Sequence, residues 1–415
     1  MITKISVLVL TMLLITACER DELCPLDHQI KSTRSIVLED GPQTLELDRS
    51  DVARIAVPTI SQEIFLDSLV SNYSFIQLET NDQSLIGNID KLVVASPYLF
   101  VLDLQNNKAF RFSMDGTFLG SIGQKGKAYA NYKRLNDLSV NPARKEIALL
   151  DLKSGYQLYY NYEGVFLRKQ PLYYYYSKME FIGDSLQVQV SDLHNNKRTP
   201  SVDGHQLLLS GYSQEPLYKG FSYSKEIRRH FHWCSSTPLL RVNNEVYHHH
   251  LLSDTIWQVK PGVCKARYVL DFTDRTSLFQ ASEQGTMSDR AYEAKIEGRR
   301  YFFGRYMLTD RWAYFGISTA WKGMDMLLYN QKTGESVYGS IAKRGNPIFS
   351  LLLNTFDFAF DRNALVRVVQ PFDAVRMKAW LQEEGRWDDL SSEDRSFLDG
   401  LNEEANPVLM VVRFK

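Results

Sequence analysis

The chain has 415 residues, of which 44% are hydrophobic and 12% aromatic, and 48 basic and 49 acidic side chains leave a formal net charge of −1. This balance excludes the strong basic excess that a nucleic-acid partner would require. The 23 tyrosines and 22 phenylalanines favour β-strands. The composition therefore predicts a folded, strand-rich protein without a nucleic-acid partner.

Residues 1–17 have the form of a secretory signal peptide. Lys4 precedes an apolar run from Ile5 to Ile15, and Thr16 and Ala17 lead into Cys18. The run is too short for a spanning helix, which needs about 20 apolar residues. Small residues before a cysteine resemble the lipobox of bacterial lipoproteins. The resemblance implies cleavage before Cys18, lipid attachment there, and a mature chain held on a membrane by its lipid anchor.

The segment after the cysteine, residues 18–60, is predicted to be the lipidated N-terminus and a tether. Its acidic cluster from Glu19 to Glu22 resembles the export signal of surface lipoproteins in Bacteroides-type bacteria. A solvated tether is the simpler interpretation of four charged residues. The expected location is the bacterial cell envelope, as an outer-membrane lipoprotein facing the surface or the periplasm.

A unit of three strands repeats in the first half of the chain. Strand-like runs end at Asp103 and Asp151, and each is followed by a second strand and a tight turn, at Gly116 and Gly164. Both pairs of equivalent residues are 48 positions apart. A period of 40 to 50 residues with several strands per period indicates propeller blades, which stack around an axis because one sheet cannot bury both of its faces alone.

Weaker echoes of the blade pattern continue to the C-terminus, and the length allows six or seven blades. Residues 288–298 read as a short helix. Residues 371–401 read as two helices, the second beginning with a capping box at Ser391 and ending at Gly400. Subtracting these insertions favours six blades. The strand around 74–78 is expected to close the ring by pairing with strands from the C-terminal end.

With these motifs the chain resembles the six-bladed β-propeller lipoproteins of Bacteroides-type bacteria, relatives of the NHL-repeat propellers. The resemblance covers about residues 74–414 and rests on the strand Tyr98 to Asp103, the Asp115-Gly116 turn, the segment Ser253 to Trp257 and the closing Asn406-Pro407-Val408. It implies an all-β fold, a six-bladed β-propeller with short helical insertions, spanning residues 61–415. Residues 123–132 keep the glycines and a tyrosine of the family's glycine-rich turn but lack its Pro and Glu. The resemblance implies a fold more than an activity.

Histidines form the strongest candidate for a metal site. Residues two apart on a strand share a face, so His230 with His232, and His248 with His250, could each present two imidazoles to one ion. Some NHL-type lyases hold a metal in the propeller channel with histidines from several blades. Here five of the eight histidines fall between 230 and 250, which is more typical of an edge strand with exposed imidazoles. The sequence implies no cofactor.

Tyrosines form the candidate ligand-binding surface. In a strand, the run of Tyr173, Tyr174, Tyr175 and Tyr176 would place two rings on each face, and one pair could form a platform for a sugar or an apolar patch of a partner. Tyrosines packed between blades are the alternative.

Cysteines suggest no disulfide framework, although Cys234 and Cys264 could pair across neighbouring strands. We therefore predict a binding or interaction module for a protein partner or a glycan, rather than an enzyme. A metal-dependent lyase or hydrolase with its site in the channel is the alternative.

Overall fold

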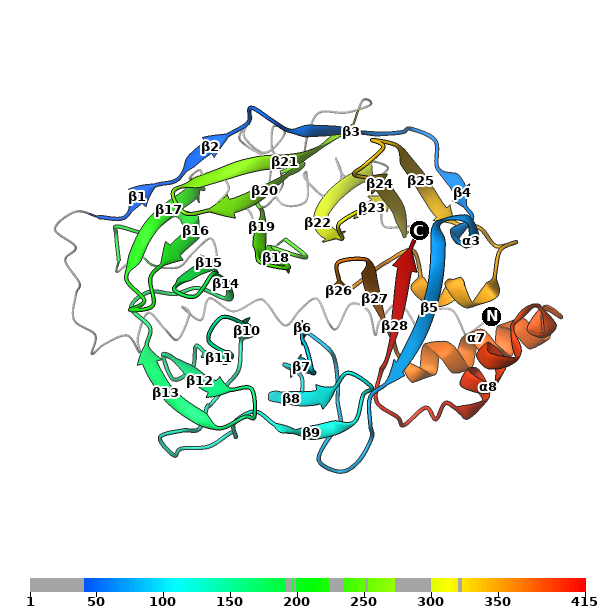
Figure 1. The fold of residues 1–415 in the computed structure, drawn as a ribbon, viewed down its shortest axis with the longest axis horizontal. Coiled ribbons are helices and arrows are strands. Elements are labelled where there is room, and N and C mark those ends of the chain that lie inside the picture. The colour runs from blue at the N-terminus through cyan, green and yellow to red at the C-terminus, as the bar shows by residue number, and fades with distance from the viewer. Residues whose placement is uncertain are drawn as a thin grey trace, which may run out of the picture.

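The computed structural model describes residues 41–191, 196, 199–223, 235–250, 253–272, 300–319 and 323–415. Within these residues, six β-sheets stand around a central axis as the blades of a propeller (Figure 1). The predicted all-β fold and the count of six blades are therefore confirmed. The helix expected at 288–298 lies outside the described residues.

Each blade has four strands that are ordered from the axis outward. Blade 1 contains β6 (Lys91–Ala95), β7 (Tyr98–Asp103), β8 (Lys108–Ser113) and β9 (Phe118–Ser121). Blade 2 contains β10 (Asp137–Asn141), β11 (Glu146–Asp151), β12 (Tyr156–Asn161) and β13 (Phe166–Pro171). Blade 3 contains β14 (Lys178–Ile182), β15 (Leu186–Val190), β16 (His205–Ser210) and β17 (Pro216–Ser222). Blade 4 contains β18 (Leu239–Val242), β19 (Glu245–His249), β20 (Thr255–Lys260) and β21 (Val263–Phe272). Blade 5 contains β22 (Arg300–Leu308), β23 (Trp312–Thr319), β24 (Met324–Asn330) and β25 (Ser336–Ile341). Blade 6 contains β26 (Phe358–Asp361), β27 (Ala364–Val369), β28 (Val408–Phe414) and β5 (Val70–Gln77).

The 48-residue repeat places the same residue types at equivalent positions of blades 1 and 2. Asp103 ends β7 and Asp151 ends β11, and both carboxylates are buried. Each accepts a hydrogen bond from the backbone N–H four positions before its inner strand, at 2.8 and 2.6 Å. Gly116 and Gly164 have φ angles of 92° and 84°, which favour glycine. The repeated residues therefore fix the loops and turns that set the shape of the blade.

Alternating residues of one strand pack against two different blades. In β11, Ile147 and Leu149 pack against side chains of blade 1. Their neighbours Ala148 and Leu150 pack against side chains of blade 3. All four are fully buried, because a blade inside the ring has no face in water. The hydrophobic core therefore forms between neighbouring blades when they stack around the axis.

Blade 6 joins the two ends of the described chain. β28 pairs with β27 on one side and with β5 on the other, with Val408 opposite Gln77 and Arg413 opposite Asn72. The predicted closure by residues 74–78 is confirmed. The strand that completes the ring is therefore held by two ladders.

An N-terminal belt of four short strands adds to the outer edges of blades 3 to 5. β1 (Gln43–Thr44) pairs with β17, β2 (Glu46–Asp48) and β3 (Ala53–Val57) pair with β21, and β4 (Gln62–Ile64) pairs with β25, all in parallel. Leu45, Ile55 and Val57 of this segment are buried. The structure differs here from the expected tether over 18–60, because residues 43–57 belong to the sheets.

Helices lie outside the ring beside blade 6, where α7 (Pro371–Glu383) and α8 (Ser392–Gly400) precede β28 (Figure 1). The predicted pair of helices is confirmed, and the Ser391 side chain caps α8 by accepting the Asp394 N–H at 3.0 Å. The Phe397 ring stacks on Phe75 of β5 at 3.8 Å between ring centroids, so α8 packs on the outermost strand. The remaining helical turns are α3 (Leu66–Leu69), η2 (Pro347–Leu352) and η3 (Trp387–Asp389). None of the described helices is long and apolar enough to cross a membrane.

Candidate binding site

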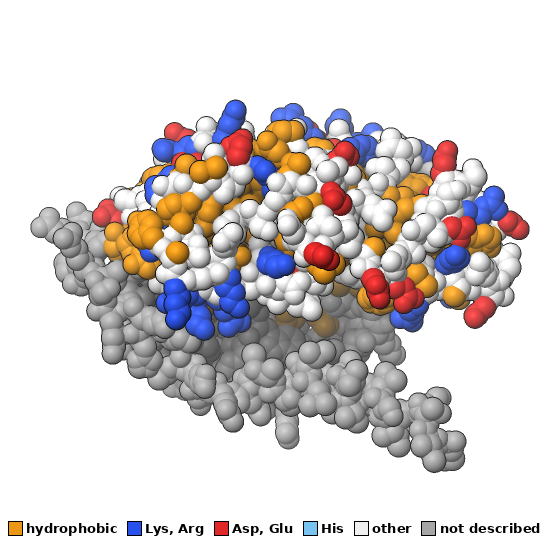
Figure 2. All heavy atoms as spheres, turned by 90° about the horizontal axis from the view of Figure 1, so that it is seen from below, with side chains coloured by type: hydrophobic (Ala, Val, Ile, Leu, Met, Phe, Trp, Pro, Cys, Tyr) orange, Lys and Arg blue, Asp and Glu red, His pale blue; other side chains and the backbone are white. Residues whose placement is uncertain are grey.

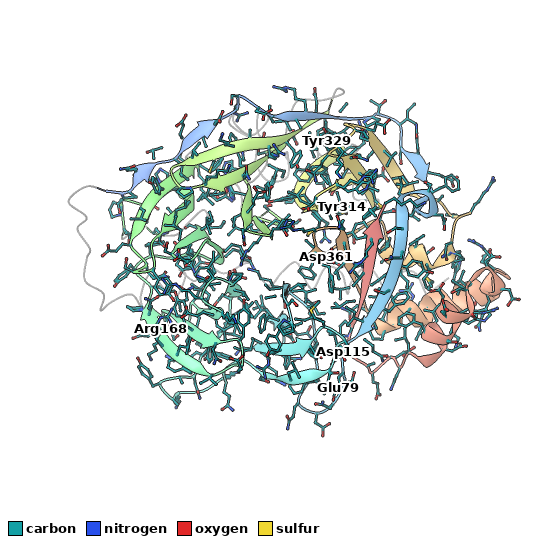
Figure 3. The ribbon with its side chains drawn as sticks, in the orientation of Figure 1. Glu79, Asp115, Arg168, Tyr314, Tyr329 and Asp361 are labelled. Carbon is teal, nitrogen blue, oxygen red and sulfur yellow. The ribbon has the colours of Figure 1, made fainter. Side chains whose placement is uncertain are left out.

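The central channel holds a cavity of about 950 Å³. Its wall includes residues from the innermost strand of every blade: β6, β10, β14, β18, β22 and β26. Among the described residues in this wall, seven are basic and five acidic. Figure 3 shows Asp361 beside the central opening, whereas Glu79, Asp115 and Arg168 lie at the outer edge of the ring. Charged side chains therefore line the central channel, although apolar side chains could have filled it.

One group of charges connects blades 1, 2 and 3. The Lys91 ammonium lies 3.1 Å from the Asp137 carboxylate and 2.6 Å from the Glu180 carboxylate. Asp137 also accepts the Met179 N–H at 2.7 Å, and Glu180 accepts the Ser139 hydroxyl at 2.8 Å. Burial lowers the pKa of Lys91, but the two carboxylates raise it more strongly, so its net shift is upward. This cluster is compact, hydrogen-bonded and buried.

A second group of charges connects blades 5 and 6. Asp357, just before β26, accepts hydrogen bonds from Arg305 of β22 at 3.1 Å and from Arg367 of β27 at 2.9 Å. It also accepts the Val368 N–H at 2.8 Å. Two guanidinium groups thus share one carboxylate, which leaves one positive charge in excess. One third of the Arg305 side chain is exposed, at 33%.

Arg241 of β18 in blade 4 has no carboxylate within ion-pair distance among the described residues. Its guanidinium donates to the backbone carbonyls of Val140, across the channel in blade 2, and of Asn243. Burial lowers the pKa of Arg241, while Glu180 acts in the opposite direction. The cost of burying this cation is only partly offset by neutral carbonyl groups.

The tyrosine run lies in the connection between β13 and β14 and not in a strand, which corrects the assumption behind the predicted platform. Tyr174 and Tyr176 are 1% exposed and pack between blades 2 and 3. Their hydroxyls bond to the side chains of Gln189 and Gln214. Burial raises the pKa of both hydroxyls. Tyr173 and Tyr175 are partly buried against the same cluster, so the packing alternative describes this segment better than a surface platform.

Of the predicted metal-binding histidines, His248 and His250 are described, whereas His230 and His232 lie outside the described residues. His248 and His250 are buried, not exposed on an edge strand, and their ring centroids are 6.4 Å apart. Nδ1 of His248 lies 2.9 Å from the Pro238 carbonyl, and Nδ1 of His250 contacts the Gln206 side chain. Among the described residues, no three His, Cys, Asp or Glu side chains are grouped as a metal site.

His249, which the sequence did not select, is held by Ser235 and the Ser253 carbonyl, each at 2.7 Å. It packs against β22 of blade 5, with its ring centroid 4.9 Å from that of Phe302. Burial lowers the pKa of His249 to about 4 and, with a contribution from His249, that of His250 to about 3. His248, His249 and His250 are therefore structural groups between blades.

Three cysteines are also part of the predictions, Cys18 as the lipidation site and Cys234 with Cys264 as a possible pair. Cys18 and Cys234 are outside the described residues, and Cys264 is a buried free thiol whose pKa burial raises to about 12.

Sequence reasoning missed the charged channel. A signal exists, because Lys91 begins the otherwise apolar β6, Asp137 begins β10, and Glu180 lies between the apolar residues Met179 and Phe181 of β14. Their convergence follows only once the blades are in register around the axis.

Comparison with known proteins identifies the family. Residues 52–413 match the model of a family described as a domain of unknown function, DUF4934. The chain belongs to this family. A comparison with curated proteins gives no match. Kinship of DUF4934 proteins with NHL-repeat propellers stays a prediction.

A solved structure of a Bacteroides protein shares the fold of this DUF4934 protein. A Bacteroides fragilis protein named "Putative exported protein" is 19% identical, with a TM-score of 0.69 over 88% of this chain and 100% of that one. A member of the DUF4221 family from Bacteroides vulgatus is 11% identical, with a TM-score of 0.49 over 84% and 97% of the two chains. At these identities the first likeness shows the propeller fold alone.

Proposed function

We propose that this DUF4934 protein is a lipid-anchored binding module of the cell envelope that takes its ligand, a glycan or a segment of a partner protein, into the central channel. The observation that carries the proposal is the cavity of about 950 Å³ with charged side chains from several blades in its wall. Ligand pockets commonly have volumes of 300 to 1,000 Å³. Burying charge in a channel costs stability, and recognition is a reason to retain it.

Anchoring through Cys18 is the second part of the proposal. It is supported by the signal-like residues 1–17 and by the similarity to the Bacteroides fragilis protein that is named as exported. Replacing the cysteine, Cys18→Ala, is expected to release the protein from the membrane fraction or to mislocalise it, since the acyl chains supply the bilayer affinity. A variant that still sediments with membranes and resists high salt would contradict the anchor.

Blocking the channel tests the binding site. The mature chain is applied to an array of neutral and acidic glycans and to cross-linked envelope extract, and each ligand found is then remeasured with Ala95→Trp and Ala359→Trp. Both alanines lie in the channel wall, on β6 and β26. Ala128→Trp, at an exposed position outside the channel wall, is the matched control.

Loss of binding in both channel variants, with binding retained in the control, is expected. Circular dichroism and thermal unfolding report whether each variant is folded. A folded channel variant that binds as well as the control would place the ligand elsewhere and overturn the channel as the site.

A further inference from the structure

The two sides of the channel differ in net charge. The wall contributed by blades 1 to 3 has three basic and three acidic side chains, whereas that of blades 4 to 6 has four basic and two acidic ones. Within the first side, Lys91 faces two carboxylates, so this cluster by itself has one negative charge in excess. Asp137 is fully buried and the Glu180 side chain is 5% exposed. This acidic excess is turned into the wall and already accepts protein donors. It therefore offers little to a ligand.

The side of blades 4 to 6 has a positive excess. Arg305 and Arg367 share Asp357, and Arg241 bonds only to backbone carbonyls among the described residues. Asp361, the other acidic residue in this part of the wall, is paired at 3.0 Å with Arg413, which lies outside the cavity wall. Arg362 of this wall has no ion pair among the described residues, but it is exposed. Of the cations in this part of the wall that are not exposed, Arg241 has no carboxylate partner and Arg305 shares its only one with Arg367.

Arg241 and Arg305 lie on neighbouring inner strands, between two links that hold blades 4 and 5 together. On one side of them, the Thr237 N–H donates to the Gly304 carbonyl at 3.0 Å. On the other, the Asn243 amide donates to the Asp310 carboxylate at 3.3 Å. Both arginines are in the cavity wall, with Arg305 next to the first link and Arg241 towards the second. They therefore occupy different levels of the same part of the wall.

We propose that this face, formed by Arg241 and Arg305, binds the carboxylate of an acidic glycan. The inference rests on the proposed function, because it names the ligand class of the same channel. A guanidinium group presents paired N–H donors that match a carboxylate, and a charge-assisted hydrogen bond is stronger inside a cavity than in water. The bound anion supplies the directly paired carboxylate that Arg241 lacks among the described residues.

A glycan fits the rest of this wall better than a protein segment does. Ser236, Thr237, Asn243 and Asn244 line the same side of the cavity and provide hydroxyl and amide groups for sugar hydroxyls. The cavity has the volume of a small-ligand pocket, whereas a stable protein interface buries roughly 1,600 Å² of surface. A short uronic-acid oligosaccharide combines the required carboxylate, hydroxyl groups and size.

The test uses trigalacturonate and its fully methyl-esterified form, which has the same sugar rings without the charges. Calorimetric titration of the mature chain is expected to show binding of the acid, weakening as salt is added, and at least about tenfold weaker binding of the ester. Arg241→Gln and Arg305→Gln should each weaken binding of the acid at least about tenfold. Arg395→Gln, on α8 and paired with Asp388, is the control that should leave binding unchanged.

Each contrary result has a distinct meaning. Equal binding of acid and ester, unaltered binding in folded Arg241→Gln and Arg305→Gln, or no binding of the acid overturns the carboxylate site. If Ala95→Trp and Ala359→Trp still abolish binding of another ligand, the channel function stands without it. If both tryptophan variants still bind trigalacturonate, its site is not in the channel, and the proposed channel function is overturned as well. Capture of an acidic protein segment, without trigalacturonate binding, would replace the glycan by a protein partner.

Discussion

The first half of the ring is regular, whereas the second half departs from the repeat. Blades 1 and 2 have strands of four to six residues in a 48-residue register. Blades 4 and 5 contain strands of ten and nine residues, β21 and β22. The pairing of β22 with β23 is interrupted between Phe302 and Tyr306, whereas the register shifts of blades 1 and 2 fall between consecutive residues. The regular half carries the self-contained Lys91 cluster, and the irregular half carries the arginines with incomplete pairing. The departure from the repeat therefore coincides with the proposed binding face.

The outer edges of the blades show a second difference. Blades 3 to 5 are covered by β1 to β4, whereas among the described residues no further strand pairs with β9 or β13 of blades 1 and 2. Figure 2 views the ring from this side and shows hydrophobic side chains among the charged ones. Leu119, Val165 and Leu167 are exposed there. The belt thus stabilises chiefly the half that departs from the repeat.

Removing the closing strand should have the largest effect. Deletion of residues 404–415 takes away β28 and both of its ladders, which leaves β5 without its partner strand and β27 paired with β26 alone. The loss is expected to exceed a typical net stability of about 5 to 15 kcal/mol, so the product should aggregate or be proteolysed. A chain lacking residues 18–48 loses only β1 and β2 from the belt and should still unfold cooperatively. A soluble, cooperative C-terminal deletion would contradict ring closure.

The buried ion cluster of the regular half should come next. Lys91→Met leaves Asp137 and Glu180 without their cation, and we expect a loss of about 3 to 5 kcal/mol in the free energy of unfolding. Arg305→Gln in the other half should cost less than about 1 kcal/mol, since Asp357 keeps Arg367 and Arg305 is partly exposed. Urea unfolding of both variants measures the difference. Equal losses would remove the distinction between a structural cluster and a binding face.

The sequence predicts the fold correctly where a local pattern repeats along the chain or where a residue type has a known structural role, such as capping a helix. The spacing from Asp103 to Asp151 revealed the blades, and the capping residues at Ser391 located α8. The belt was missed because strands of two to five residues in a polar segment have no readable periodicity. Tyr174 and Tyr176 were misjudged because their burial depends on a loop path and not on strand alternation.

Two glycines with similar φ angles, one in each half, show how well each half tolerates an added side chain. Gly304, in the irregular part of β22, has φ of 77°, and a Cβ atom there would overlap Oγ of Ser235 and Nδ1 of His249. Gly164, in the regular turn of blade 2, has φ of 84°, with only the Ser121 carbonyl oxygen near, at 3.4 Å. Gly304→Ala should cost about 3 kcal/mol and Gly164→Ala about 1 kcal/mol, measured by thermal unfolding. Equal costs would show that the contact of blades 4 and 5 at Gly304 is loose.

Acidification should weaken the irregular half first. His249 has a pKa lowered by burial to about 4, so the folded state keeps this imidazole neutral while the unfolded chain binds a proton below about pH 6.5. Its contribution to stability is complete above pH 6.5 and is lost as the pH falls towards 4. The expected loss from this group is about 2 kcal/mol at pH 5.

Hydrogen exchange at pH 7.5 and 5 provides the readout, because blades 1 and 2 contain no histidine. Protection should fall in β19 and β22 before it falls in β7 and β11. His249→Gln should flatten the pH dependence of stability, and an unchanged slope would show that another group is responsible.

The position of a bound anion tests the central claim most directly. Crystals of the mature chain grown in bromide reveal anion sites by anomalous scattering without assuming a particular ligand. We predict a bromide peak in the channel beside Arg241 and Arg305. We expect no peak beside the Lys91 cluster, because its two carboxylates outnumber its one cation and repel anions. A peak at Lys91, or bromide only on the outer surface, would contradict the assignment of the binding face to the irregular half.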